Sequence, residues 1–398
     1  MKRYLKDFNL TLEFVQMSIY ECLDKQRWTR ADTAWMLSEY AQIWQIENGK
    51  SFQSRKILAR KIRETAFKDK TKLYYLVDFM CKKIFKEITE EKITLDPIKY
   101  EKRIDAGSLK EREIGISSMK QQCLDYIAVN ACKPMFEAKI GHYQCASIKN
   151  KGQLFGKKAI ETWIRTNPKK CRYIWKGDIR KFYNSVDHDI LKRFLARDIK
   201  NKTVLYLLYT LIDTYKQGLC IGSYLCQFLA NYLLSYAYHF VNEFLYVERR
   251  GKRIKLVWYV LFYMDDVFMT SSSKKNLKKA VKEFEKYLNE VLKLELKPTH
   301  QLFPLDSRPI DMMGYKIYTY KTTVRKRIFK KANRVFRKVS KQGYVSLKQA
   351  RRIVSYYGYF KYSDSKKYLQ KIKFENVINK SKEMISNDKR NNGKTARV

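Results

Sequence analysis

Two adjacent carboxylates, Asp265 and Asp266, stand between apolar, β-prone residues on both sides. Burying a carboxylate costs several kcal/mol unless a cation or hydrogen bonds compensate, and two adjacent carboxylates also repel each other. A hairpin turn that presents both groups to metal ions would resolve both problems. An ordinary solvated turn is the alternative, because Asp favours turns.

A third carboxylate, Asp178, ends a second apolar stretch that begins at Tyr173. Two strand ends that each carry Asp could converge on a pair of divalent cations. Two metals about 3.5–4 Å apart suit in-line phosphoryl transfer, because one lowers the pKa of an attacking 3′ hydroxyl and the other holds a triphosphate. Oxygen ligands favour Mg²⁺, and Mn²⁺ is an alternative.

The segments around these carboxylates predict an α+β fold with an antiparallel sheet and helices on one face. Strand patterns occupy residues 173–179, 255–263, 267–270 and 302–320, and a hairpin is expected over 99–116. Helical spacing covers residues 10–20, 31–46, 54–67, 73–88, 119–136, 157–165, 188–196, 202–216, 224–244, 277–292, 329–341 and 346–357. The polar end of the chain, from about residue 379, is expected to fray.

The charge balance points to a polyanionic partner. The 398-residue chain carries 83 Lys and Arg against 40 Asp and Glu, a formal net charge of +43. The positive residues are spread along the whole chain, which favours a partner that lies in a long groove. Nucleic acid is the expected partner, and an acidic membrane or the ribosome is the alternative.

The cysteines and histidines exclude some classes of nucleic-acid-binding protein. Eight cysteines without a Cys-x-x-Cys pair and four scattered histidines argue against a zinc site and against an HNH-type nuclease. The N-terminus lacks the apolar segment of a signal peptide, and the longest apolar runs are too short to span a bilayer. These features predict free, buried thiols in a cytoplasmic protein without a membrane partner.

Three motifs resemble those of reverse transcriptases. Tyr263-Met264-Asp265-Asp266 is similar to the family signature, and residues 177–188, which read GDIRKFYNSVDH, resemble the first catalytic motif of the bacterial enzymes. Residues 311–316, which read DMMGYK, resemble the primer-grip strand. The motifs occur in the family's order over roughly residues 96–360. They imply an RNA-templated DNA polymerase of a bacterial or phage retroelement.

The resemblance implies a role for each matching residue. Asp178, Ile179, Asp265 and Asp266 would form the metal site, and Lys297 would protonate the departing pyrophosphate. Lys110 and Arg112 would grip the triphosphate, Tyr183 would exclude a 2′ hydroxyl, and Met313, Gly314 and Tyr315 would abut the primer terminus. The ordinary alternatives are a solvated hairpin face for Lys110 and Arg112, a core aromatic for Tyr183 and a surface lysine for Lys297.

The segment 219–227, which reads LCIGSYLCQ, discriminates between subfamilies. Ile221-Gly222 with Gln227 downstream resembles the nucleotide-binding segment of diversity-generating retroelement enzymes, which misincorporate opposite template adenines and work with a small basic accessory protein. Cys226 stands where those enzymes have Ser. Because Ile221 cannot hydrogen-bond a nucleotide as Gln would, we expect a looser grip and error-prone cDNA synthesis.

The resemblance also implies a right-hand polymerase with fingers, palm and helical thumb. A basic helical extension would span residues 1–95, fingers and palm 96–316, and the thumb, with a flexible basic tail, 317–398. The expected partners are an RNA template, the cDNA product and their hybrid. A structured non-coding RNA, a small basic accessory protein and a second copy of the chain are further candidates.

Three alternatives stay open on sequence alone. A defence-associated reverse transcriptase that acts against phage with a non-coding RNA would share these motifs. A non-catalytic RNA-binding protein of this fold would be expected to lose the carboxylates, yet Asp178, Asp265 and Asp266 are all present. An RNA-dependent RNA polymerase is disfavoured, because such enzymes usually carry Gly-Asp-Asp and a smaller residue than Tyr183 in the sugar pocket.

Overall fold

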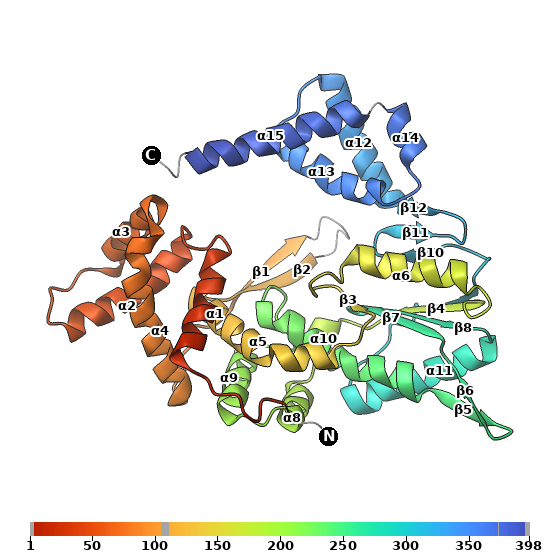
Figure 1. The fold of residues 1–398 in the computed structure, drawn as a ribbon, viewed down its shortest axis with the longest axis horizontal. Coiled ribbons are helices and arrows are strands. Elements are labelled where there is room, and N and C mark those ends of the chain that lie inside the picture. The colour runs from red at the N-terminus through yellow and green to blue at the C-terminus, as the bar shows by residue number, and fades with distance from the viewer. Residues whose placement is uncertain (1–3, 105–110, 373, 395–398) are drawn as a thin grey trace. The chain divides into compact units, whose positions relative to one another are not determined.

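The computed structural model describes residues 4–104, 111–372 and 374–394 (Figure 1). These residues form two compact units. The first unit comprises the described parts of Met1–Gly141, Lys181–Tyr236 and Asn289–Leu294. The second comprises the described parts of His142–Arg180, Ala237–Leu288 and Glu295–Val398. Helices and strands are mixed throughout the chain, so the α+β prediction is confirmed.

Helices make up most of the first unit. They are α1 (Leu12–Asp24), α2 (Ala31–Glu47), α3 (Arg55–Lys68), α4 (Tyr74–Thr89), α5 (Met119–Lys139), α7 (Phe182–Ser185), α8 (His188–Asp198) and α9 (Lys202–Asp213), with a 3₁₀ turn at Lys70–Leu73 and the start of α10 (Tyr224–His239). The predicted hairpin is formed by β1 (Lys99–Ile104) and β2 (Glu111–Ile116), and residues 105–110 between these strands lie outside the described residues. The predicted N-terminal helices are confirmed, because each buries the apolar stripe that its spacing indicated.

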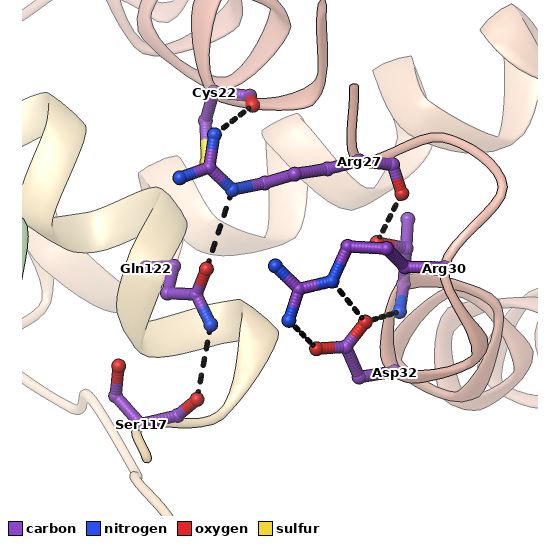
Figure 2. Close-up of polar contacts among 7 residues, drawn as sticks. Cys22, Arg27, Arg30, Asp32, Ser117 and Gln122 are labelled. Carbon is purple, nitrogen blue, oxygen red and sulfur yellow. Dashed lines mark hydrogen bonds and ion pairs between the residues drawn. The ribbon is translucent and has the colours of Figure 1, made fainter. Parts of the chain in front are cut away.

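The N-terminal helices are tied to the start of α5 by Arg27, on the loop between α1 and α2 (Figure 2). Its guanidinium donates from Nη1 to the Cys22 carbonyl at 2.9 Å and from Nε to Gln122 Oε1 at 3.3 Å. Gln122 then donates to the carbonyl of Ser117, at 3.1 Å, on the segment that joins β2 to α5. One arginine thus links the helical extension to the corner between the hairpin and α5.

A five-stranded sheet organises the second unit. In spatial order its strands are β3 (Gln144–Cys145), β7 (Tyr259–Tyr263), β8 (Asp266–Ser271), β4 (Tyr173–Asp178) and β9 (Gln301–Pro304). Neighbouring strands are antiparallel except for the parallel pair β3–β7. This unit also contains α6 (Gln153–Thr166), α11 (Lys274–Tyr287), a π-helical turn at Phe240–Phe244, the hairpin β5 (Tyr246–Arg249) and β6 (Lys252–Lys255), and the small sheet β10 (Ile310–Met312), β11 (Tyr315–Ile317) and β12 (Thr322–Val324). A second π-helical turn, Leu288–Leu292, follows α11 and belongs to the first unit from Asn289 onward.

Helices cover both faces of the five-stranded sheet. Ile174 of β4 shares an apolar cluster with Trp163 of α6 on one face. Trp175, the next residue along β4, contacts Phe284 of α11 on the other, with ring centroids 6.1 Å apart. The expectation of helices on one face only is therefore wrong. Both faces of the central strands carry apolar side chains, and each face must be buried.

Four helices follow the small sheet: α12 (Lys326–Gln342), α13 (Leu347–Lys361), α14 (Lys366–Lys371) and α15 (Phe374–Lys394). They share an apolar cluster that includes Phe336, Phe360, Phe374 and Ile378. The prediction that the chain frays from about residue 379 is wrong as far as Lys394, because α15 continues through that segment. The apolar residues that precede the polar tail anchor its first turns in the cluster.

All eight cysteines are free and buried, as the sequence predicted. None of the helices in the described part of the chain is both long enough and apolar enough to cross a membrane.

Candidate active site

Three carboxylates gather at one end of the central sheet in the second unit. Asp178, the last residue of β4, pairs in register with Asp266, the first residue of β8. Asp265 occupies the turn between β7 and β8, and its carbonyl accepts a hydrogen bond from the Ile179 amide at 3.0 Å. Met264, beside it, has a φ of 51°, a left-handed conformation that is rare outside glycine. A strained turn therefore presents this pair of acids next to a strand end that carries the third.

The carboxylates perturb one another electrostatically. Burial, followed by repulsion from Asp178 and from Asp266, raises the pKa of Asp265 to about 6. The pKa of Asp266 is also raised, chiefly by burial, although Lys176 opposes the shift. Partly buried acids that resist ionisation together form a site whose charge a cation would stabilise.

Lysines neutralise part of this charge. Lys297 Nζ forms an ion pair with Asp178 Oδ1, and the Lys297 amide donates to the Asp178 carbonyl at 2.8 Å. Lys176 Nζ lies 3.9 Å from an Asp266 oxygen and donates to the Asp311 carbonyl at 2.8 Å. The structure thus places Lys297 beside Asp178, and its predicted role as a proton donor stays a prediction. Lys176 was not singled out from the sequence, although a lysine two residues before Asp178 in an apolar strand is a detectable signal.

The donor chemistry of these acids fits a divalent cation. Carboxylate oxygens are hard ligands of the type that Mg²⁺ prefers. Within the described ranges, however, no three His, Cys, Asp or Glu residues are gathered closely enough to hold a metal as they stand. Asp178 would have to exchange its contact with Lys297 for a contact with the ion.

The predicted primer grip forms the turn between β10 and β11. Met313 and Gly314 have φ values of 53° and 84°, and a Cβ on Gly314 would lie 2.5 Å from the Tyr359 ring. The side chains of Met313 and Tyr315 are 5% and 1% exposed, so both belong to the core. A primer contact at this turn would therefore come from its backbone.

Arg325 supports the same turn. Its amide donates to the Gly314 carbonyl at 2.9 Å, and its Nε donates to Asp311 Oδ1 at 2.6 Å. Burial raises the pKa of Asp266, and the positive charge of Arg325 opposes part of that increase. This arginine was not predicted, because its two partners precede it by more than ten residues and only the folded chain brings them together.

In the first unit, backbone hydrogen bonds hold several of the residues that were predicted to contact the incoming nucleotide. The Leu219 amide donates to the carbonyl of Tyr183 at 2.7 Å, and the amide of Gly115, on β2, donates to the carbonyl of Ile221 at 2.9 Å. Gly222 has a φ of 119°, and a Cβ there would lie 2.7 Å from the Gly115 carbonyl. The loop that carries Ile221 and Gly222 is therefore held by backbone contacts with α7 and β2.

For the other residues predicted to contact the nucleotide, the structure gives less detail. Lys110 lies outside the described residues. Arg112 is exposed on β2, opposite Arg103 in the register of the hairpin. Gln227 is partly buried in the first turns of α10, where its carbonyl accepts a hydrogen bond from Asn231 at 2.9 Å.

A buried acid that was not predicted lies beneath the Ile221–Gly222 loop. Asp125, on α5, is 0% exposed, and its Oδ2 accepts hydrogen bonds from Ser223 Oγ at 2.8 Å and from the Leu225 amide at 3.5 Å. Ser223 Oγ in turn accepts from the Cys226 amide at 3.2 Å. Asp125 and Ser223 therefore cap the N-terminus of α10. A lone acid within the apolar run 124–129 was the available sequence signal.

A sheet with acids at one end fits chemistry on phosphate groups, and the net charge of +43 fits a polyanionic substrate such as nucleic acid. A family model described as reverse transcriptase (RNA-dependent DNA polymerase) matches residues 102–317, more than half of the chain. The chain belongs to this family. It is therefore an RNA-directed DNA polymerase, which is a nucleotidyltransferase.

Other comparisons are weaker. No curated protein gives a significant match. A solved structure of apo telomerase from Candida tropicalis, truncated from its C-terminal domain, shares 14% sequence identity over 68% of each chain, with a TM-score of 0.40. At this TM-score the likeness carries no weight for the fold or the site.

Proposed function

We propose that this reverse transcriptase extends a primer 3′ end by two-metal phosphoryl transfer, with Asp178, Asp265 and Asp266 as the metal ligands and Ile179 contributing its carbonyl. The observation that carries the proposal is the register of the sheet, which pairs Asp178 with Asp266 beside the turn that holds Asp265. When bound, Mg²⁺ would activate the primer hydroxyl and stabilise the leaving pyrophosphate.

The chain's own residues then have separate tasks. Burial and repulsion between the carboxylates raise the pKa values of Asp265 and Asp266, so ionisation of these acids is costly and a bound cation would offset that cost. Lys297 holds Asp178 when no cation competes. Once displaced, its ammonium would stand near the leaving group and could donate a proton to pyrophosphate. The turn at Gly314 would meet the primer through its backbone.

Nucleotide selection is proposed for the loop in the first unit. Tyr183 would exclude a 2′ hydroxyl, Arg112 and Lys110 would contact the triphosphate, and Ile221, Gly222 and Gln227 would face the incoming nucleotide. Ile221 offers no side-chain hydrogen bond, which supports a loose grip and error-prone synthesis. Comparing errors opposite template adenines for wild type and Ile221→Gln tests this, and equal error rates would contradict it.

We infer a bacterial or phage retroelement of the diversity-generating type as the biological setting, supported by the pattern Ile221-Gly222 with Gln227. A small basic accessory protein and a structured RNA are the partners expected there. Defence against phage is the alternative role. Frequent errors at adenines would favour the first role, and faithful copying would favour the second.

The decisive experiment is extension of a primed RNA template with dNTPs and Mg²⁺ by wild type, Asp265→Asn and the exposed control Asp306→Asn. We expect extension by wild type and by the control and none by Asp265→Asn. Each variant removes one carboxylate, but only Asp265 lies beside Asp178 and Asp266. Equal extension by all three proteins would refute the assignment of the metal site.

A further inference from the structure

A groove runs between α2 and α3 in the first unit, and its lining residues all differ from those assigned to polymerisation. Its volume is about 510 Å³. Trp35 of α2 and Phe67 of α3 line it together with three cationic side chains of α3, Lys56, Arg60 and Arg63. Three alanines and one acid, Glu64, complete the lining, and Glu64 lies 3.9 Å from Arg60 as an exposed ion pair that leaves the lining with a net charge of +2. Small side chains between two helices leave room for a flat group to enter.

The α3 side of this groove is one helical stripe. Lys56, Arg60, Arg63 and Phe67 recur at three- and four-residue spacing and are all exposed. Trp35 and Phe67 remain 47% and 49% exposed. Large aromatic side chains on a surface, placed together around a hollow, indicate a binding site rather than a solvated face.

The charge around the groove selects the ligand. Helix α3 carries six Lys and Arg but one Glu. Cations already lie over both rings, with the Arg55 guanidinium 4.3 Å from the Trp35 ring centroid and that of Arg63 5.7 Å from Phe67. Cations interleaved with exposed aromatics suit a chain of phosphates and bases. A second copy of this chain, itself at +43, would be repelled by the same surface.

We propose that the α2–α3 groove binds single-stranded RNA, with a base stacked on Trp35 or Phe67 and phosphates on Lys56, Arg60 and Arg63. Only an unpaired strand exposes its base faces for such stacking. The groove would hold template or guide RNA outside the polymerase site. This inference does not depend on which residues bind the catalytic metals.

The test measures binding of a fluorescein-labelled RNA strand of about 12 nucleotides to the full-length protein, by anisotropy at several salt concentrations. Excess unlabelled primer–template duplex fills the polymerase site. Arg60→Glu with Arg63→Glu is compared with Lys61→Glu and Lys68→Glu, which make the same charge change on α3 outside the groove lining. We expect the groove pair to weaken binding about tenfold or more and to flatten the salt dependence, and the control pair to change it less than about threefold.

A second pair of variants tests stacking without changing charge. Trp35→Ala with Phe67→Ala removes the groove aromatics, whereas Ile46→Ala with Phe52→Ala removes two exposed apolar side chains elsewhere on this helical hairpin. We expect a loss of about fivefold or more for the first pair and little change for the second. Circular dichroism verifies that each variant is folded.

The outcomes separate the possibilities. Equal losses in groove and control pairs would overturn the proposal in favour of non-specific charge. Tighter binding of a DNA strand of the same sequence would overturn the assignment to RNA. A dimer seen by sedimentation and lost only in Trp35→Ala with Phe67→Ala would assign the groove to a second copy. Because the readout is binding, it stays valid even where primer extension fails.

Discussion

The buried acid Asp125, beneath the Ile221–Gly222 loop, predicts a pH dependence of the protein's stability. Burial raises its pKa to about 7, although hydrogen bonds from Ser223 and from the Leu225 amide act in the opposite direction. Its Oδ1 has no hydrogen-bond partner among the described residues. The native protein therefore retains a proton on Asp125 at pH values where the unfolded chain has released it.

The sign and size of the effect follow from proton linkage. Because the folded pKa is raised, the stability contribution is fully present below about pH 4 and is lost as the pH rises through about 7. Between about pH 5 and about pH 7, two units at about 1.36 kcal/mol each amount to roughly 3 kcal/mol. Asp125→Asn cannot titrate, so this component of the pH dependence should vanish.

Urea unfolding followed by circular dichroism, at about pH 5 and about pH 8, measures the effect. The free energy of unfolding of wild type and of the control Asp306→Asn should fall between the two conditions by roughly 3 kcal/mol more than that of Asp125→Asn. Taking the difference between proteins cancels the contributions of all other titrating groups. The same pH dependence in all three proteins would refute the reasoning.

Three further predictions concern the reaction itself. Lys297→Met should lower the rate constant of nucleotide addition in single-turnover primer extension by roughly 10²-fold or more, with little change in the apparent affinity for dNTP, as expected for loss of a general acid. An unchanged rate constant would leave Lys297 as a counter-ion only. Gly222→Ala should destabilise the loop by about 1–3 kcal/mol and raise the KM for dNTPs, because the φ of 119° and the 2.7 Å approach to the Gly115 carbonyl exclude a Cβ. The control Gly152→Ala should change neither quantity, because open space surrounds Gly152. Chelation with EDTA should abolish extension and added Mg²⁺ should restore it, and activity that survives exhaustive chelation would exclude the two-metal proposal.

Local sequence was enough to predict much of this protein. Asp178 and Asp265 lie where an apolar strand ends or turns, and alternation, turn chemistry and the burial cost of a carboxylate are all readable within about ten residues. The helices of residues 1–95 were predictable for the same reason, because each buries the stripe that its own spacing defines. The motifs themselves placed the chain among the reverse transcriptases.

Only the tertiary structure decided what those residues face. The register that pairs Asp178 with Asp266, the ion pair of Asp178 with Lys297 and the position of Asp125 beneath Ser223 each join segments far apart in the chain. The coverage of both sheet faces and the extension of α15 to Lys394 likewise depend on partners that no local pattern names. Packing between segments that are far apart in the chain fixes these contacts. Local propensity does not specify which distant segments pack against each other.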